Sequence, residues 1–358
     1  MLKFKINKKF VGKDCKTYFI ADIAANHDGS LNKAKELIHM SAEAGADAAK
    51  FQNFYADTIV SDYGFKILGS KLSHQSNWKK SVYQVYKDAE VPLYWTEELK
   101  KTCDKYRIDY FTAPYDPDGP KKINKHVCAW KIGSGDITWH EHILNIAKLK
   151  KPIIIATGAS NINEVGSIYN KVRKINKKIV LMQCNTNYTA KKDNFNFINL
   201  NVLKSYKKLF PNVILGLSDH TLGYETVLGS ITLGARIIEK HFTDNNYRSG
   251  PDHKFSMNPK TWREMIDASR NLENSLRTNV KKIENNEKET FILQRRAYRY
   301  KKNFKKGEFV KYKDIIPLRP CPRNSIEIYD IDKFFNRKLK RNVKFHENLK
   351  WSDFEKKK

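Results

Sequence analysis

The sequence predicts an α/β protein, a (β/α)₈ barrel followed by a small, mostly β module. Short apolar runs alternate with amphipathic stretches over roughly the first 285 residues, and eight such runs follow one another in order. After that point the alternation gives way to short segments separated by Lys-rich turns. The 358 residues accommodate a barrel of about 250 residues and a smaller second domain.

The eight predicted strands are rich in β-branched and aromatic residues and end in small or polar residues. They cover residues 17–26, 47–54, 109–115, 128–135, 152–158, 179–186, 213–220 and 235–242. Strands that alternate with helices form parallel βαβ units, and eight units in order close into a barrel.

The predicted helices show apolar residues at spacings of three and four. They cover residues 31–44, 97–106, 161–174, 201–209, 223–233 and 259–276. One long insertion, residues 61–92, follows the second strand, and we expect it to cap one end of the barrel. The predicted domains are a barrel over 1–284, a charged linker over 285–294 and a β module over 295–358.

The formal net charge of +28 raises the possibility of a nucleic-acid-binding protein. However, the excess is mainly lysine spread along the whole chain, with many asparagines, which is typical of solvated helix faces. The densest basic stretch, residues 333–344, lies away from the residues that carry chemistry, and the basic residues form no recognisable motif with aromatics. We therefore expect no nucleic-acid partner.

The five cysteines are dispersed and contain no CxxC pair, which argues against a disulfide framework and a structural zinc site. The first residues contain no long apolar stretch, so we expect no signal peptide. No segment approaches the roughly 20 apolar residues of a membrane span. These features predict a cytoplasmic protein without a membrane partner.

The active site of a (β/α)₈ barrel lies at the C-terminal ends of its strands, so the polar residues there are the candidates for chemistry. Six of the eight predicted strands, or the loops that follow them, supply such residues. They are Asp22, Lys50, Gln52, Lys131, Ser134, Asp136, Tyr188, Ser218, His220, Glu239, His241 and Asp252.

Two of these candidates, Lys50 and Lys131, lie within predicted strands, where a buried charge is costly unless it is paired. A phosphate or carboxylate ligand would remove that cost, and a pair of structural salt bridges is the alternative. A further alternative is a Schiff-base aldolase that uses Lys131 or Lys240 as its nucleophile. The short turn at residues 133–135 is a plausible phosphate contact, because glycines let backbone N–H groups approach an anion.

His220 and His241 end consecutive predicted strands, so their imidazoles can converge on one metal ion. A histidine satisfied within the core is the alternative for each. No thiolate is obviously placed to join the pair, which leaves positions for water and substrate oxygens. The sequence therefore favours Mn²⁺ or Mg²⁺ over a closed zinc site.

Taken together, these residues resemble the sialic acid synthase family, which includes the legionaminic and pseudaminic acid synthases. The resemblance runs nearly the full chain, and the module after the barrel resembles the antifreeze-like domain of these enzymes. The matching segments are IADIAANHDGSLNKAKELIHMSAEAGADAAKFQ (20–52), WKIGSGD (130–136), IIATGAS (154–160), GLSDHT (216–221), EKHFT (239–243) and GPDHKFSM (250–257).

The resemblance implies that phosphoenolpyruvate condenses with the aldehyde of a 2-acylamino sugar such as N-acetylmannosamine, and that phosphate leaves by C–O cleavage. A metal on His220 and His241 would polarise the aldehyde. By resemblance, phosphoenolpyruvate is held by Lys50, Lys131, Ser134 and Ser218, the sugar site includes Gln52, Tyr188 and Asp252, and the catalytic carboxylates are Asp22, Asp136 and Glu239.

The resemblance also implies a domain-swapped homodimer, in which Arg319 of the module reaches the partner subunit's site and contacts the acylamino group. The chain departs from the family where it has Asp22 and Asp136 in place of glutamate. Other departures are Ala156, Gln183 and the turn RPCPRN (319–324). They leave the identity of the sugar open.

Overall fold

The computed structural model divides the chain into two compact units, Met1–Arg277 and Thr278–Lys358. It describes residues 2–69, 72, 75–76, 78–333 and 336–355. The first unit contains a closed parallel barrel, which confirms the predicted fold class, and the second contains a small antiparallel sheet.

The barrel strands pair in chain order, and the ring closes where β10 pairs with both β9 and β3. Each strand lies inside one of the eight ranges predicted from the sequence. They are β3 (Tyr18–Asp22), β4 (Ala48–Asn53), β5 (Asp109–Pro114), β6 (Trp130–Ile132), β7 (Ile153–Ala156), β8 (Ile179–Cys184), β9 (Ile214–Asp219) and β10 (Ile237–His241).

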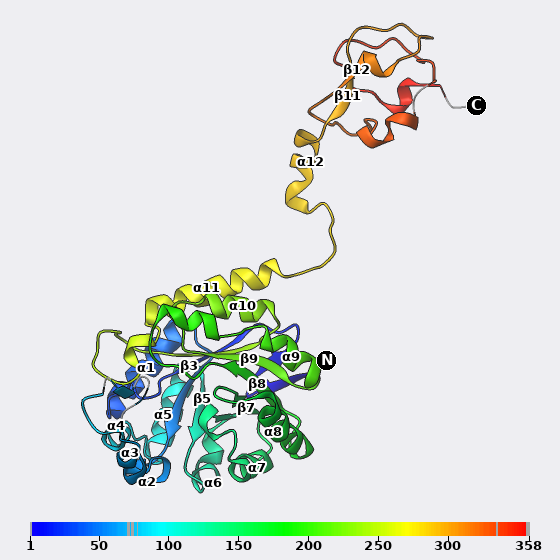
Figure 1. Cartoon of the computed structure of the whole chain (residues 1–358). Coiled ribbons are helices and arrows are strands. Elements are labelled where there is room, and N and C mark those ends of the chain that lie inside the picture. The colour runs from blue at the N-terminus through cyan, green and yellow to red at the C-terminus, as the bar shows by residue number, and fades with distance from the viewer. Residues whose placement is uncertain (1, 70–71, 73–74, 77, 334–335, 356–358) are drawn as a thin grey trace. The chain divides into compact units, whose positions relative to one another are not determined.

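Helices surround the barrel (Figure 1). They are α1 (Leu31–Glu43), α5 (Trp95–Lys105), α6 (Gly119–Ile123), α7 (His140–Lys148), α8 (Ile162–Ile175), α9 (Val202–Leu209), α10 (Glu225–Thr232) and α11 (Pro259–Ser275). Side-chain hydrogen bonds cap the N-termini of several of these helices. Helix α8, for example, begins at a capping box of Asn161 and Glu164. Helices α6 and α7 were absent from the prediction, and the other six match predicted ranges closely.

Side chains along each strand alternate between the barrel interior and the helix layer. On β10, Ile237 belongs to the interior cluster, whereas Ile238 packs in the outer layer with the helices. The same period of two then directs Glu239 and His241 inward, where both line the main pocket. The interior is therefore apolar near the strand starts and polar near the strand ends.

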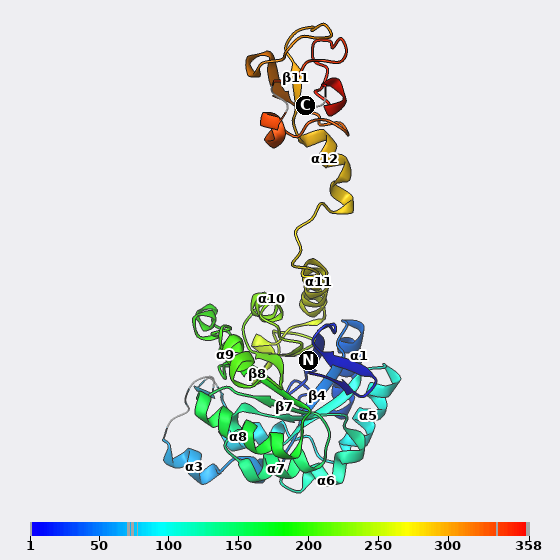
Figure 2. The same ribbon diagram turned by 90° about the vertical axis from the view of Figure 1, so that its right-hand side faces the viewer.

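An antiparallel hairpin of β1 (Lys3–Ile6) and β2 (Lys9–Gly12) precedes the barrel and was not predicted. Its apolar residues Phe4, Ile6 and Val11 join the interior cluster of the barrel. Figure 2 shows this blue hairpin on the side of the barrel that faces the viewer. The hairpin closes the end of the barrel at which the strands begin.

The insertion after β4 forms α3 (Asp62–Ile67) and α4 (Val82–Asp88), preceded by α2 (Ala56–Ile59). In Figure 1 these helices and the N-terminus lie on opposite sides of the barrel unit. Several insertion residues, among them Trp78 and Tyr86, line the pocket at the strand ends. The predicted capping role of the insertion is therefore confirmed.

The second unit contains the short sheet of β11 (Ala297–Tyr300) and β12 (Ile315–Leu318). Isolated bridges such as Phe304–Val343 and Leu339–Phe354 hold the rest of the module around its own apolar core. The region predicted as a linker is partly helical, because Asn285–Glu287 forms a 3₁₀ turn and Lys288–Gln294 forms α12.

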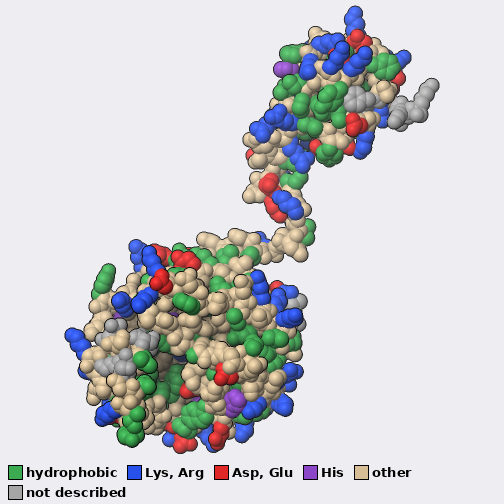
Figure 3. Space-filling model, in the orientation of Figure 1, with side chains coloured by type: hydrophobic (Ala, Val, Ile, Leu, Met, Phe, Trp, Pro, Cys, Tyr) green, Lys and Arg blue, Asp and Glu red, His purple; other side chains and the backbone are tan. Residues whose placement is uncertain are grey.

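Lysine and arginine side chains are spread around the visible face of the barrel unit (Figure 3). This distribution agrees with the prediction that the high positive charge belongs to a solvated surface. Among the described residues, no helix is long and apolar enough to cross a membrane.

Candidate active site

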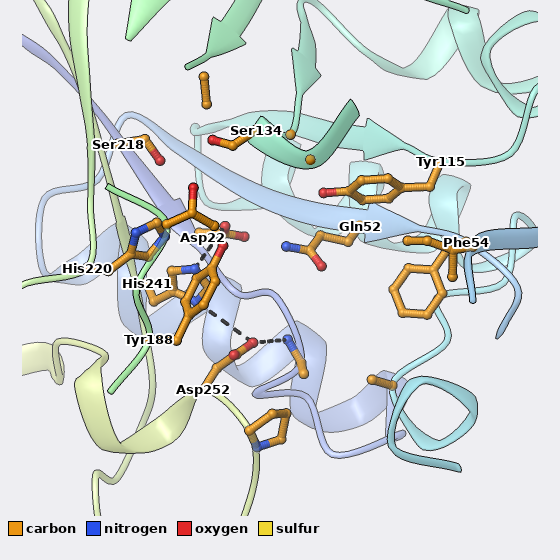
Figure 4. Close-up of a pocket in the computed structure, with 18 of the residues that line it drawn as sticks. Asp22, Gln52, Phe54, Tyr115, Ser134, Tyr188, Ser218, His220, His241 and Asp252 are labelled. Carbon is orange, nitrogen blue, oxygen red and sulfur yellow. Dashed lines mark hydrogen bonds and ion pairs between the residues drawn. The ribbon is translucent and has the colours of Figure 1, made fainter. Parts of the chain in front are cut away.

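The strand ends of the barrel surround a pocket with a volume of about 350 Å³. This volume suits a small molecule. Every site residue predicted from the barrel sequence lines it. These residues are Asp22, Lys50, Gln52, Lys131, Ser134, Asp136, Tyr188, Ser218, His220, Glu239, His241 and Asp252. Figure 4 shows many of them converging on one space.

The two predicted lysines are buried and ion-paired at the bottom of this pocket. Lys50 Nζ lies 2.7 Å from Asp22 Oδ2, and Lys131 Nζ lies 3.1 Å from Glu239 Oε1. Lys50 also lies 3.9 Å from Glu239 Oε2, so Glu239 bridges the lysines. Both lysines therefore form the salt bridges that were the alternative to ligand binding. These salt bridges nevertheless face the cavity. A lysine ammonium has three donors, so an anionic ligand could bind beside each carboxylate.

The two carboxylates of this cluster differ in electrostatic environment. Burial raises the pKa of Asp22, even though Lys50 opposes the shift. Burial would raise the pKa of Glu239 as well, but Lys131 and Lys50 together hold the pKa of Glu239 below its usual value. The hydroxyl of Ser218 donates a hydrogen bond of 3.0 Å to Glu239 Oε1 and further stabilises the charged form.

The imidazoles of His220 and His241 meet as the sequence predicted, with ring centroids 5.3 Å apart. His220 Nδ1 lies 3.0 Å from the carbonyl of Asn185 and must donate to it, since a carbonyl only accepts. Tyr188 packs edge-on at 4.4 Å from His220, and Phe255 lies 4.8 Å from His241. The aromatic rings hold both imidazoles in place.

His241 is buried between two acidic side chains. Its Nε2 lies 3.5 Å from Asp22 Oδ2, and its Nδ1 lies 3.8 Å from Asp252 Oδ2. Nδ1 forms no hydrogen bond with any described residue. Burial, together with His220 and the neighbouring lysines, lowers the pKa of His241 well below its usual value, so the ring is neutral.

The remaining pocket carboxylates and hydroxyls lie around this centre. Burial raises the pKa of Asp252 to about 6, and it also raises the pKa of Asp136. Asp252 Oδ2 accepts a hydrogen bond of 3.1 Å from the backbone N–H of Ala25. Ser134 Oγ accepts one of 3.0 Å from the backbone N–H of Gly158, which fixes the turn after β6.

The remaining predicted site residue, Arg319, belongs to the other unit, Thr278–Lys358. It is exposed there, and its Nε donates a hydrogen bond of 2.7 Å to the carbonyl of Gln294.

Comparison with known proteins places this pocket in a family. Residues 37–281 match the NeuB family. The chain belongs to the NeuB family. It is 33% identical to the N,N'-diacetyllegionaminic acid synthase of Campylobacter jejuni, with 94% of this chain and 99% of the relative covered. It is 31% identical to the pseudaminic acid synthase of the same species, with 96% and 98% covered.

A solved structure supports the same assignment. The spore coat polysaccharide biosynthesis protein SpsE of Bacillus subtilis shares 27% identity with this NeuB-family chain. The TM-score is 0.65, and all of both chains is covered. The likeness to this solved structure covers both the barrel and the module.

The histidine pair of this NeuB-family chain fits a divalent metal ion. Because His220 Nδ1 is held by a carbonyl, its Nε2 remains available as a ligand, an arrangement common at metal-bound histidines. His241 is neutral and has a buried nitrogen without a hydrogen bond in the described part of the chain. The described residues form no cluster of three or more His, Cys, Asp or Glu ligands, so the protein would supply two imidazoles.

Sequence reasoning missed several pocket neighbours. Cys184 was not among the predicted site residues, although it lines the pocket and its Sγ lies 3.9 Å from His220 Nδ1. Cys184 ends β8, and the period of two along that strand could have placed it in the pocket. Phe255 and Tyr115 were also missed, although both fall in segments with other recognised features.

The alternative role of Lys240 as a Schiff-base nucleophile was also wrong. Lys240 points away from the pocket, because its strand neighbours Glu239 and His241 point inward. Its Nζ lies 2.5 Å from Asp219 Oδ2 and donates to the carbonyl of Thr221 at 2.7 Å. This buried pair links β9 to β10 directly beside the two histidines.

We expect Lys240→Met to lower the free energy of unfolding by about 3–5 kcal/mol, because the buried Asp219 carboxylate would lose its charged partner. Urea denaturation measures the loss. Adding Asp219→Asn removes the unpaired charge and should recover much of the stability. A single variant as stable as the parent would show that the pair contributes nothing.

Proposed function

We propose that this chain condenses phosphoenolpyruvate with the open-chain aldehyde of a 2-acylamino sugar and releases phosphate, forming a nonulosonic (sialic) acid. The observation that carries the proposal is the convergence of two lysines, two histidines and four acidic side chains in one pocket of the barrel. The NeuB-family assignment and the names of the relatives support the same reaction.

The chemistry assigns a task to each group. C3 of phosphoenolpyruvate attacks the aldehyde carbon, water attacks C2, and the C2–O bond breaks as phosphate leaves. Lys50 and Lys131 neutralise the phosphate and carboxylate, with Ser134 and Ser218 as further donors. The proton released by the attacking water needs an acceptor, and we assign that role to the catalytic carboxylates expected from the sequence, Asp22, Asp136 and Glu239, all of which line the pocket.

His220 and His241 would hold Mn²⁺ or Mg²⁺, and Gln52, Tyr188 and Asp252 would contact the sugar. When bound, the metal supplies Lewis-acid polarisation of the aldehyde. Tyr188 lies against both imidazoles, at 4.4 and 6.1 Å, so a sugar in contact with Tyr188 would also lie near the histidines.

A phosphate-release screen tests the proposed function. The purified chain is incubated with phosphoenolpyruvate, Mn²⁺ or Mg²⁺, and a panel that includes N-acetylmannosamine and sugars with a second acylamino group. Phosphate release that depends on the acceptor supports the proposal, and it also distinguishes sialic from legionaminic or pseudaminic acid synthesis. Borohydride trapping of pyruvate on a lysine, with activity unaffected by chelator, would instead support an aldolase.

The role of the module is proposed from its sequence. We infer a domain-swapped homodimer in which Arg319 contacts the acylamino group in the partner subunit's site. Arg319 is exposed in the module, as this role requires.

We expect Arg319→Ala to raise the KM for the sugar by about 10-fold or more and to change the KM for phosphoenolpyruvate much less, because a charged hydrogen-bond donor is lost. Steady-state kinetics with each substrate varied measures both constants. Mixing Arg319→Ala with His241→Ala subunits should restore some activity if sites are shared. An effect on phosphoenolpyruvate alone would contradict the assignment.

A further inference from the structure

Tyr115, directly after β5, presents an unused hydroxyl to the pocket. The residue lines the cavity, and no described residue forms a hydrogen bond with its hydroxyl oxygen. Figure 4 shows the phenol pointing into the space between Gln52 and Ser134. Its ring is held by its backbone N–H bond to the Asn53 carbonyl at 3.0 Å and by Phe54, which packs edge-on at 6.2 Å.

The glycine turn after β6 is built around this phenol. A Cβ on Gly133 would come within 2.5 Å of the Tyr115 hydroxyl oxygen, although the backbone of Gly133 is extended and suits any residue. Gly133 is therefore required for space, and it lets the hydroxyl lie directly against the turn. By contrast, a Cβ on Gly135 would meet no atom within 4 Å, although Gly135 also lines the pocket.

The Tyr115 hydroxyl and Gly135, which has free space where a side chain would lie, both line this pocket. Ser134 lies between the two glycines, and Lys131 is two residues before Gly133 on the strand that leads into the turn. A hydroxyl donor, a serine, a lysine and a glycine without a side chain together suit a phosphate group. Two further polar groups lie near the phenol: Gln52, which carries no charge, and the Asp136 carboxylate.

We propose that the Tyr115 hydroxyl donates a hydrogen bond to the phosphate of phosphoenolpyruvate and that Gly135 leaves the room that this phosphate occupies. This inference rests on the proposed function. It adds to the predicted substrate contacts a residue that the sequence reasoning did not select.

We expect Tyr115→Phe to raise the KM for phosphoenolpyruvate by about 10-fold or more, since a hydrogen bond to a charged group is lost, with little change in the KM for the sugar. Inhibition by inorganic phosphate should weaken by a similar factor, and inhibition by pyruvate, which lacks a phosphate, should not change. Gly135→Ala should weaken phosphoenolpyruvate binding as well, because its methyl group enters the same space.

Tyr206→Phe is a matched control. It also removes a phenol oxygen, but that oxygen is buried outside the pocket and bonds to Thr157 Oγ1 at 2.8 Å. Its substrate constants should equal those of the parent. An unchanged KM for phosphoenolpyruvate in Tyr115→Phe, a rise in the sugar KM alone, or weaker inhibition by pyruvate but not by phosphate would each overturn the inference. Acceptor-dependent phosphate release by the parent chain tests the proposed function separately.

Discussion

Replacing His220 or His241 with alanine should reduce acceptor-dependent phosphate release by more than about a thousandfold, because a bound metal supplies several kcal/mol of transition-state stabilisation. Either histidine alone would leave the ion with one protein ligand. The same variants should lose Mn²⁺ binding, which electron paramagnetic resonance measures without any turnover. His220→Gln and His241→Gln retain most of the side-chain volume and separate ligand loss from a packing defect.

His39→Ala is the control for this prediction. His39 lies on α1, pairs with Glu43 at 2.9 Å and does not line the pocket. This variant should bind Mn²⁺ and turn over like the parent. Full activity of His220→Ala or His241→Ala in the presence of a chelator would refute the metal site.

Replacing Lys131 with methionine should raise the KM for phosphoenolpyruvate by about 10- to 100-fold, because a charge-assisted contact to an anion is lost. Lys131 is paired with Glu239 at 3.1 Å, so the single variant also leaves that buried carboxylate with the more distant Lys50, at 3.9 Å, and the Ser218 hydroxyl. Steady-state kinetics and urea denaturation on the same protein measure the two effects separately.

The double variant Lys131→Met/Glu239→Gln distinguishes substrate binding from a structural salt bridge. It removes both charges of the pair, so stability should largely recover in either case. If Lys131 binds substrate, the KM for phosphoenolpyruvate stays high. If Lys131 serves only the salt bridge, the KM for phosphoenolpyruvate returns toward that of the parent. Lys151→Met, whose Nζ bonds the Val127 carbonyl outside the pocket, controls for the loss of a lysine.

Much of the barrel could be predicted, because alternating strands and helices leave one way to close eight parallel strands. The N-terminal hairpin could not. Its strands are four residues long. Exposed lysines alternate with Phe4 and Ile6 in β1, whereas the buried Val11 follows two exposed residues in β2. In the sequence alone, this pattern is typical of a charged tail. The segment forms a hairpin because its apolar side chains pack into the barrel interior.

Placement of the candidate site residues followed from the same geometry. Side chains that point inward at the end of a parallel strand must meet at one face, and this condition brings Asp22, Lys50 and His241 together. Contacts made by residues in loops were harder to predict from the sequence. The approach of Phe255 to the histidines depends on the path of the chain after β10, and the use of Tyr115 depends on space left by Gly133.

The most direct test of the account uses phosphoenolpyruvate labelled with ¹⁸O at the oxygen that bridges C2 and phosphorus. The labelled substrate is turned over with the best acceptor and Mn²⁺, and both products are analysed by mass spectrometry. Condensation with C–O cleavage predicts that the label appears in phosphate and that the sugar product gains three carbons. Label retained in the organic product, or no acceptor-dependent phosphate with any acylamino sugar, would contradict the account.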